Sequence, residues 1–266
     1  MIDLGLQGRT AIVTGANSGI GEAITKTLAS QGVHTVIHFL DDEDIREIPG
    51  AESQAVHRGR AGAEAVREAI VQAGGRAELI AGDLHRPDTI RNLFSQANDM
   101  FGPISILVSN AAHCESPDTL TTTSAGSIER TFRINTQAPV LVAQEFLRQY
   151  DPSAHPFGRI IGISTDAAQT FAGQISYGAS KAALEAYTRS IAIEIADQRI
   201  TFNTVAPGPI QTGVYPEEFV EKVSPEIPMQ RFGTPQEIAD IVLFLCSQQA
   251  SYLTGQVIRV SGGHCL

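Results

Sequence analysis

The fold of this chain is decided by residues 10–21, which read Thr10-Ala11-Ile12-Val13-Thr14-Gly15-Ala16-Asn17-Ser18-Gly19-Ile20-Gly21. A short apolar run stops at the glycines, and a helical pattern of apolar residues follows until Gly32. Strand, glycine turn and helix, in this order, form the setting in which a turn cradles the phosphates of a dinucleotide. Gly15 permits the tight turn, while Gly19 and Gly21 let the pyrophosphate and the helix N-terminus come close. The alternative, a turn that serves packing only, is disfavoured by the flanking strand and helix.

Beyond this turn the chain alternates apolar runs with helical periodicity. The runs predict further strands at residues 33–40, 78–83, 104–108, 158–164, 199–205 and 256–260. The periodic segments predict helices at residues 61–73, 87–101, 125–133, 136–150, 176–197 and 235–247. Short links between them predict one α/β domain over residues 1–266, a Rossmann-type, doubly wound parallel sheet of about seven strands with helices on both faces.

Two segments interrupt this regular alternation. Residues 41–60 form a long connection, which we expect to be an exposed excursion at the adenine end of the cleft. Residues 209–231 are punctuated by prolines and carry apolar side chains such as Tyr215 and Phe219. This pattern favours a lid over the substrate; an ordinary surface loop with a short helix is the alternative.

Composition excludes several classes of partner. The chain has 266 residues and a formal net charge of −10, which argues against binding to nucleic acid or to an anionic membrane. No apolar run reaches the roughly 18 residues of a membrane helix, and no signal peptide opens the chain. Cys114, Cys246 and Cys265 lie far apart without metal-ligand spacing, so we expect no metal site and a reducing, cytoplasmic location.

A candidate acid–base group lies in the second half of the chain. Ser164 precedes Tyr177 by thirteen positions, and Lys181 follows that tyrosine by four. On a helix, Tyr177 and Lys181 lie one turn apart on the same face, so the ammonium is expected to lower the phenol pKa from its free value of about 10. Such a tyrosine acts as a general acid or base. Ser164 ends a strand, where ligands of open α/β sheets bind, and it can hold the oxygen that exchanges the proton.

The choice between NAD and NADP depends on the end of the second strand. A carboxylate there favours the free 2′-hydroxyl of NAD and an arginine favours the 2′-phosphate of NADP, but the strand ends in Phe39-Leu40. The acidic run at residues 41–44 would repel a phosphate, whereas Arg58 and Arg60 could fold back onto one. The alternative is that all six charges belong to a solvated loop. Electrostatics favours NAD(H) slightly.

Other polar residues follow the predicted strands. Asp83 either accepts a hydrogen bond from the adenine amino group or stabilises a turn. Asn110 can tie neighbouring strand ends together, and Asn135 either binds backbone or holds an ordered water. His113 and Cys114, as isolated residues, are expected to be inert.

Taken together, these motifs resemble the short-chain dehydrogenase/reductase family, with the closest likeness to its 3-oxoacyl-carrier-protein reductase and glucose-dehydrogenase-like branches. The resemblance covers essentially the whole chain and rests on Thr14-Gly15-x-x-x-Gly19-Ile20-Gly21, Asn110-Ala111-Ala112, Asn135, Ser164, Tyr177-x-x-x-Lys181 and Pro207-Gly208. Three departures stand out: Ser109-Asn110-Ala111-Ala112 replaces the commoner Asn-Asn-Ala-Gly, the second strand matches neither cofactor signature, and the connection at 41–60 is longer than usual.

The resemblance implies the catalytic roles. Tyr177 would be the acid/base, Lys181 would lower its pKa and bond the nicotinamide ribose, Ser164 would orient the carbonyl, and Asn135 would hold a water in a proton relay. The remaining cofactor contacts implied by the family are Gly15, Ser18, Gly19, Ile20, Gly21, Asp83, Asn110, Ala111, Pro207, Gly208, Ile210 and Thr212.

The activity so implied is a carbonyl reductase: an NAD(P)-dependent oxidoreductase that interconverts a small-molecule ketone and a secondary alcohol, assembled as a homotetramer or homodimer. A catalytically idle cofactor-binding or scaffold protein on the same fold is the alternative, because a fold does not establish an activity. Cofactor-free dehalogenase chemistry is disfavoured, since lineages of that kind lose the glycine turn and the lysine that this chain keeps.

Overall fold

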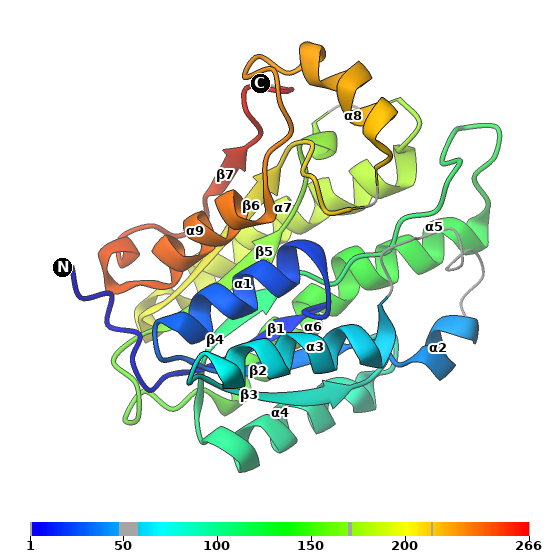
Figure 1. The fold of residues 1–266 in the computed structure, drawn as a ribbon. Helices are drawn as coiled ribbons and strands as arrows, with labels where there is room; N and C mark the ends of the chain where they lie inside the picture. The colour runs from blue at the N-terminus through cyan, green and yellow to red at the C-terminus, as the bar shows by residue number, and fades with distance from the viewer. Residues whose placement is uncertain (1, 48–57, 170–171, 214, 266) are drawn as a thin grey trace.

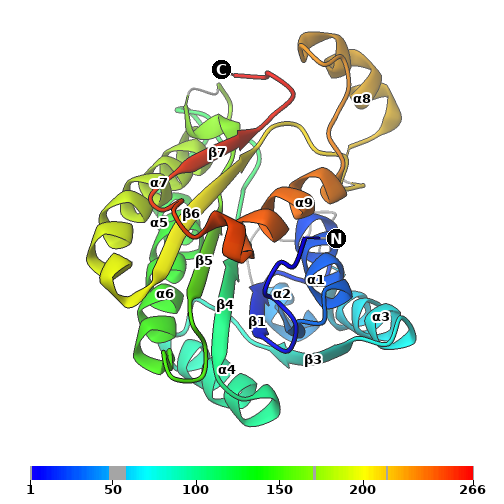
Figure 2. The same cartoon turned by 90° about the vertical axis from the view of Figure 1, so that its left-hand side faces the viewer.

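Seven parallel strands form one central sheet, with helices packed on both of its faces (Figures 1 and 2). The computed structural model describes residues 2–47, 58–169, 172–213 and 215–265. The strands lie in the order β3-β2-β1-β4-β5-β6-β7, and every neighbouring pair is parallel. Their bounds are β1 (Thr10–Thr14), β2 (His34–Phe39), β3 (Arg76–Ala81), β4 (Ile104–Ser109), β5 (Gly158–Ile163), β6 (Ile200–Pro207) and β7 (Val257–Val260). The predicted fold class is confirmed.

The helices bury one apolar core on each face of the sheet. One core holds residues of α1, α3 and α9, and the other holds residues of α4, α6 and α7. Strands between two such layers are covered on both sides, which explains why β4 and β5 are buried at every position. The helices are α1 (Gly19–Ser30), α3 (Gly59–Gln72), α4 (Pro87–Phe101), α5 (Ala125–Phe132), α6 (Ala138–Gln149), α7 (Ile175–Ile195) and α9 (Pro235–Cys246).

The strand order places a cleft at the carboxyl ends of β1 and β4. From β1 the chain moves outward to β2 and β3, and it then returns to pair β4 on the other side of β1. The helices that follow β1 and β4 therefore diverge to opposite faces, which leaves a crevice between the loops after these strands. The glycine turn follows β1 and Asn110 follows β4, so both lie at this crevice.

The structure corrects two predictions about loops. The connection at residues 41–60 is not irregular throughout, because it contains the helix α2 (Asp42–Glu47), and α3 begins at Gly59; residues 48–57 lie outside the described residues. The third strand ends at Ala81 rather than at Asp83. The chain turns there because the Asp83 carboxylate accepts a hydrogen bond from the backbone of His85 at 2.9 Å.

The segment at 209–231 contains a short helix, α8 (Glu217–Val223), followed by a 3-10 turn. In Figures 1 and 2, α8 lies beyond the carboxyl edge of the sheet, and its residues Phe219 and Val223 line the cavity described below. The C-terminal tail packs beside this segment, since the backbone of Met229 donates to the Gly262 carbonyl at 3.0 Å. Within the described residues, no helix combines the length and the apolar character needed to cross a membrane.

Candidate active site

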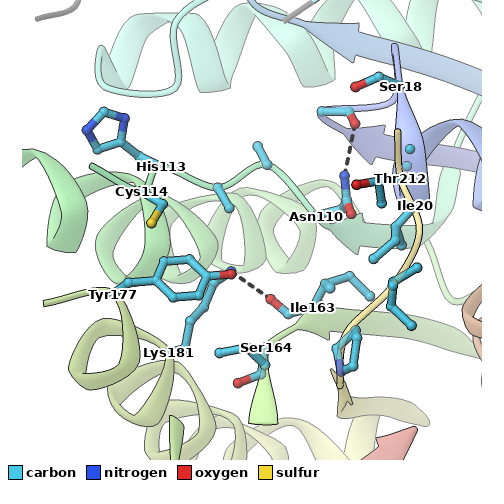
Figure 3. A pocket seen from close by; sticks show the side chains of 18 of the residues that line it. Ser18, Ile20, Asn110, His113, Cys114, Ile163, Ser164, Tyr177, Lys181 and Thr212 are labelled. Carbon is cyan, nitrogen blue, oxygen red and sulfur yellow. Dashed lines mark hydrogen bonds between the residues drawn. The ribbon is translucent and has the colours of Figure 1, made fainter. Parts of the chain in front are cut away.

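A cavity of about 630 Å³ opens at the carboxyl ends of the central strands. The structure brings nearly the whole predicted set to its wall; Figure 3 shows Tyr177, Lys181 and Ser164 on one side and Ser18, Ile20 and Thr212 opposite. The predicted residues that line it are Gly15, Ser18, Gly19, Ile20, Gly21, Asp83, Asn110, Ala111, Ser164, Tyr177, Lys181, Pro207, Gly208, Ile210 and Thr212. Asn135 lies behind the wall.

The glycine turn fits a dinucleotide because it has no room for side chains. Gly15 has φ +62, and a Cβ added there would lie 2.9 Å from the Cα of Ala111. A Cβ on Gly21 would lie 2.6 Å from the Asn110 amide nitrogen and would overlap the Gly15 carbonyl oxygen. Backbone can thus approach a pyrophosphate closely here, beside the positive N-terminal end of α1.

Asn110 holds this turn against the end of β4, as predicted. Its side-chain amide donates to the carbonyls of Thr14 at 3.0 Å and Gly15 at 2.9 Å. In return, the Thr14 hydroxyl accepts hydrogen bonds from the backbone of Asn110 and Ala111, both at 3.0 Å. The cradle is therefore fixed by strand-to-strand contacts rather than by the glycines alone.

Tyr177 and Lys181 lie one turn apart near the start of α7. The Lys181 ammonium donates to the Ile163 carbonyl at 2.7 Å and lies 5.9 Å from the centre of the Tyr177 ring. Burial lowers the pKa of Lys181 to about 8. Burial also raises the pKa of Tyr177 above its usual value, contrary to the predicted lowering by the ammonium. Removal from water is the largest cause, and nearby acidic groups such as Cys114 and Asp166 act in the same direction, so the phenol keeps its proton at neutral pH.

Ser164 is held at the end of β5 with its hydroxyl turned toward α7. Its backbone N–H donates to the Val205 carbonyl at 2.7 Å, which extends the β5–β6 ladder by one residue. Its hydroxyl donates to the Glu185 carboxylate at 2.8 Å, and burial raises the pKa of Glu185. The sequence reasoning missed Glu185, although an acid on the otherwise buried face of α7, one turn after Lys181, was a usable signal.

Asn135 binds backbone, one of the two alternatives predicted for it. It sits in a π-helical turn (Arg133–Gln137) between α5 and α6, a feature often found at functional sites. Its amide oxygen accepts from the backbone of His113 at 2.7 Å, and its nitrogen donates to the His113 carbonyl at 2.8 Å and the Ser180 hydroxyl at 3.0 Å. Asn135 thus joins the loop after β4 to α7.

A second residue missed in the sequence, Asp118, fixes the start of α7. Its side chain is 4% exposed, and one carboxylate oxygen accepts from the backbone of Ser176 at 2.8 Å and of Tyr177 at 3.0 Å. A carboxylate at a helix N-terminus satisfies otherwise unpaired N–H groups and complements the helix dipole. No local pattern marks it, since Asp118 lies 59 residues before Tyr177.

We expect an Asp118→Ala variant to unfold with a free energy about 1–2 kcal/mol lower, because two N–H groups at the start of α7 lose their acceptor. The value of kcat should fall as well, because Tyr177 lies in this first turn of α7 and its position depends on it. Asp118→Asn, which keeps an acceptor oxygen, is the matched control and should recover most of both losses. Urea unfolding and steady-state kinetics measure the two effects; equal behaviour of the two variants would contradict this role.

His113 and Cys114 follow the end of β4, and both line the cavity. The His113 imidazole and Arg130 both contact the Glu115 carboxylate, at 2.9 Å and 2.8 Å, and these contacts lower its pKa to about 2. Cys114 lines the cavity, but burial raises the pKa of its thiol to about 11, so the reactive thiolate is scarce at neutral pH.

At the adenosine end, Arg60 is paired instead of merely solvated. Its guanidinium lies 2.5 Å from the Asp41 carboxylate and 5.4 Å from the centre of the Phe39 ring, directly after β2. Arg58 lies 3.7 Å from Glu22. The end of β2 is therefore followed by an ion pair between the Asp41 carboxylate and the Arg60 guanidinium.

Comparisons with known proteins agree with this architecture. A family model described as enoyl-(acyl carrier protein) reductase matches residues 47–264. The 3-oxoacyl-(acyl-carrier-protein) reductase of Aquifex aeolicus is 36% identical over 98% of this chain and 99% of its own length. A short-chain dehydrogenase/reductase of Serratia marcescens has a TM-score of 0.85 and 30% identity, covering 98% of this chain and 99% of its own.

A further solved structure, an angucycline C-6 ketoreductase with bound NADP, has a TM-score of 0.85 and 30% identity over 98% of this chain and 96% of its own. Because relatives this similar align with the chain from one end to the other, it belongs to the short-chain dehydrogenase/reductase family.

Proposed function

We propose that this NAD(P)-dependent oxidoreductase works as a ketone reductase in which Tyr177 donates the proton. The observation that carries the proposal is the phenol of Tyr177, which faces the cavity beside Lys181 and lies opposite the glycine cradle. Its raised pKa keeps the phenol protonated at neutral pH, the form in which it can act as an acid.

The residues divide the work as follows. When bound, the nicotinamide cofactor supplies the hydride. Tyr177 gives its phenolic proton to the carbonyl oxygen, and Lys181, anchored to Ile163, stabilises the phenolate that remains. Ser164 can orient the same oxygen only after its hydroxyl turns away from Glu185. Asn135 keeps the loop after β4 and α7 in register.

A panel of ketones mixed with reduced cofactor tests this function. We expect the loss of reduced nicotinamide absorbance to match alcohol formation one to one. Tight binding of NADH or NADPH without turnover of any ketone would instead favour the idle cofactor-binding alternative.

We propose that Asp41 makes NAD(H) the preferred cofactor. Because Asp41 holds Arg60, this guanidinium is not available to a 2′-phosphate, and the acidic run after β2 repels one. The pairing lowers the pKa of Asp41, so the carboxylate stays ionised at neutral pH.

An Asp41→Asn variant should free Arg60 and shift the NADPH-to-NADH affinity ratio toward NADPH by about tenfold. Fluorescence titration with both cofactors measures the ratio, with Glu43→Gln on the exposed face of α2 as the charge-matched control. Tighter binding of NADPH than of NADH by the unmodified protein would overturn the preference.

The segment at 209–231 is proposed as the lid, because Ile210, Thr212, Tyr215 and Phe219 from it line the cavity.

A homotetramer is proposed from the outer side of α7, where Tyr187 is 47% and Ile193 80% exposed. Light scattering on the purified protein tests the assembly. A cytoplasmic location is proposed from the cysteine usage, because the three cysteines lie far apart in the sequence without metal-ligand spacing.

A further inference from the structure

An aromatic surface faces the part of the cavity that lies beyond Tyr177. The Tyr215 and Phe219 rings stack with centres 5.1 Å apart, and Phe232 meets Tyr215 edge-on at 5.6 Å. All three rings line the cavity, yet Tyr215 is 39% and Phe219 43% exposed. When a ligand covers apolar rings that contact water inside a cavity, the burial favours binding. The favourable contribution is largest when the covering group is itself a ring.

An acid–imidazole pair forms another part of the same wall. The Asp166 carboxylate lies 2.6 Å from the His264 imidazole, and both side chains line the cavity. Asp166 follows Ser164 by two residues, whereas His264 comes from the C-terminal tail. Burial first, and neighbouring charges that include Asp166 second, raise the pKa of both Tyr177 and Tyr215. Asp166, Tyr177 and Tyr215 line the same cavity.

The charges of this region restrict the substrate. Asp166 and Glu226 both line the cavity, and the whole chain carries a net charge of −10. Anionic substrates are repelled here, and an acidic carrier protein finds no complementary surface in these residues. A carboxylate in the cavity wall does suit a hydroxyl group, which can donate to the acid.

We propose that the substrate is a neutral, hydroxyl-bearing aryl ketone whose ring stacks on Tyr215 and Phe219 and whose hydroxyl binds the Asp166–His264 pair. This inference rests on the proposed reductase function. In the reaction, the carbonyl carbon gains a hydride from the reduced cofactor and its oxygen gains a proton from Tyr177, which yields a secondary alcohol. The ring and its hydroxyl remain unchanged.

Four types of matched ketone test the proposal: 1-tetralone, its saturated counterpart 1-decalone, a set of hydroxy-1-tetralones and a carboxy-1-tetralone. We expect kcat/KM for 1-tetralone to exceed that for 1-decalone by about tenfold, through KM more than through kcat. At least one hydroxy-1-tetralone should exceed 1-tetralone by a similar factor, and the carboxylate should be the poorest of the aryl ketones.

Substitutions test which residues cause the preference for an aryl ring and the preference for a hydroxyl group. Tyr215→Leu combined with Phe219→Leu should bring the tetralone-to-decalone ratio toward one, while Tyr252→Leu, at a fully exposed surface position, should leave it unchanged. Asp166→Asn should reduce the preference for the hydroxyl and raise the turnover of the carboxy-1-tetralone.

The outcomes separate two failures. Equal kcat/KM for tetralone and decalone, or a preference for the carboxylate, would overturn the substrate class while leaving the reductase intact. Tight cofactor binding with no turnover of any of these ketones would overturn the reductase function, and the substrate class with it.

Discussion

A Tyr177→Phe variant is expected to reduce ketones about 10²–10⁴-fold more slowly than the unmodified protein. The substitution removes only the hydroxyl, so the ring still fills its place in the cavity wall. Lys181 keeps its hydrogen bond to Ile163, because that contact does not involve the phenol. Steady-state kinetics with a saturating cofactor isolates the lost proton transfer as a fall in kcat.

The control is a second tyrosine of the same helix. Tyr187→Phe, ten residues further along α7 and 47% exposed, loses the same atom without touching the cavity and should retain full turnover. Cofactor binding should be nearly equal in both variants. Near-unchanged turnover by Tyr177→Phe on every accepted ketone would exclude this tyrosine as the proton donor.

A Gly21→Ala variant is expected to weaken cofactor binding by about 5- to 150-fold, the equivalent of roughly 1–3 kcal/mol of overpacking. The added methyl group would overlap the Gly15 carbonyl and crowd the Asn110 amide, which bonds that same carbonyl at 2.9 Å. To make room, the turn must move away from the end of β4. Fluorescence titration with reduced cofactor measures the loss, and thermal unfolding should show a lower midpoint.

Gly126→Ala provides the matched helical control. Its added Cβ would meet only the end of the flexible Arg130 side chain, at 3.2 Å, and Gly126 lies in α5 rather than in the cradle. We expect unchanged cofactor binding from this variant. If the Gly21→Ala variant bound the cofactor as tightly as the Gly126→Ala variant does, this result would contradict the expected close approach of the backbone to the pyrophosphate.

The sequence by itself determined the layered fold and most of the cavity wall. Strand alternation and the glycine turn are local signals: an apolar run, a residue without a side chain and a 3.6-residue period each act within a few positions. Parallel strands then bring their carboxyl ends to one edge. The fifteen predicted residues from Gly15 to Thr212 that meet in one cavity were chosen with the help of the family resemblance, which supplied most of the individual cofactor contacts.

Short charged elements were harder to predict. The helix α2 consists of six residues, three of them acidic in the first turn, and has no apolar face from which a helical period can be read. The end of β3 was placed too late because Gly82 and Asp83 continue a strand-like run, while the turn depends on a hydrogen bond to His85. Such boundaries are set by individual hydrogen bonds rather than by periodicity.

Only the tertiary structure decided how the candidate catalytic side chains are held. Asp118 accepts hydrogen bonds at the start of α7, 59 residues further along the chain. The Glu185 carboxylate accepts from the Ser164 hydroxyl, 21 residues away, and the His264 imidazole bonds Asp166, 98 residues away. Spacing correctly paired Tyr177 with Lys181, but it predicted the wrong direction for the phenol pKa. Spacing specifies which charges are neighbours, whereas burial depends on the whole surrounding fold, and here the loss of water together with nearby acidic groups raises the pKa of Tyr177.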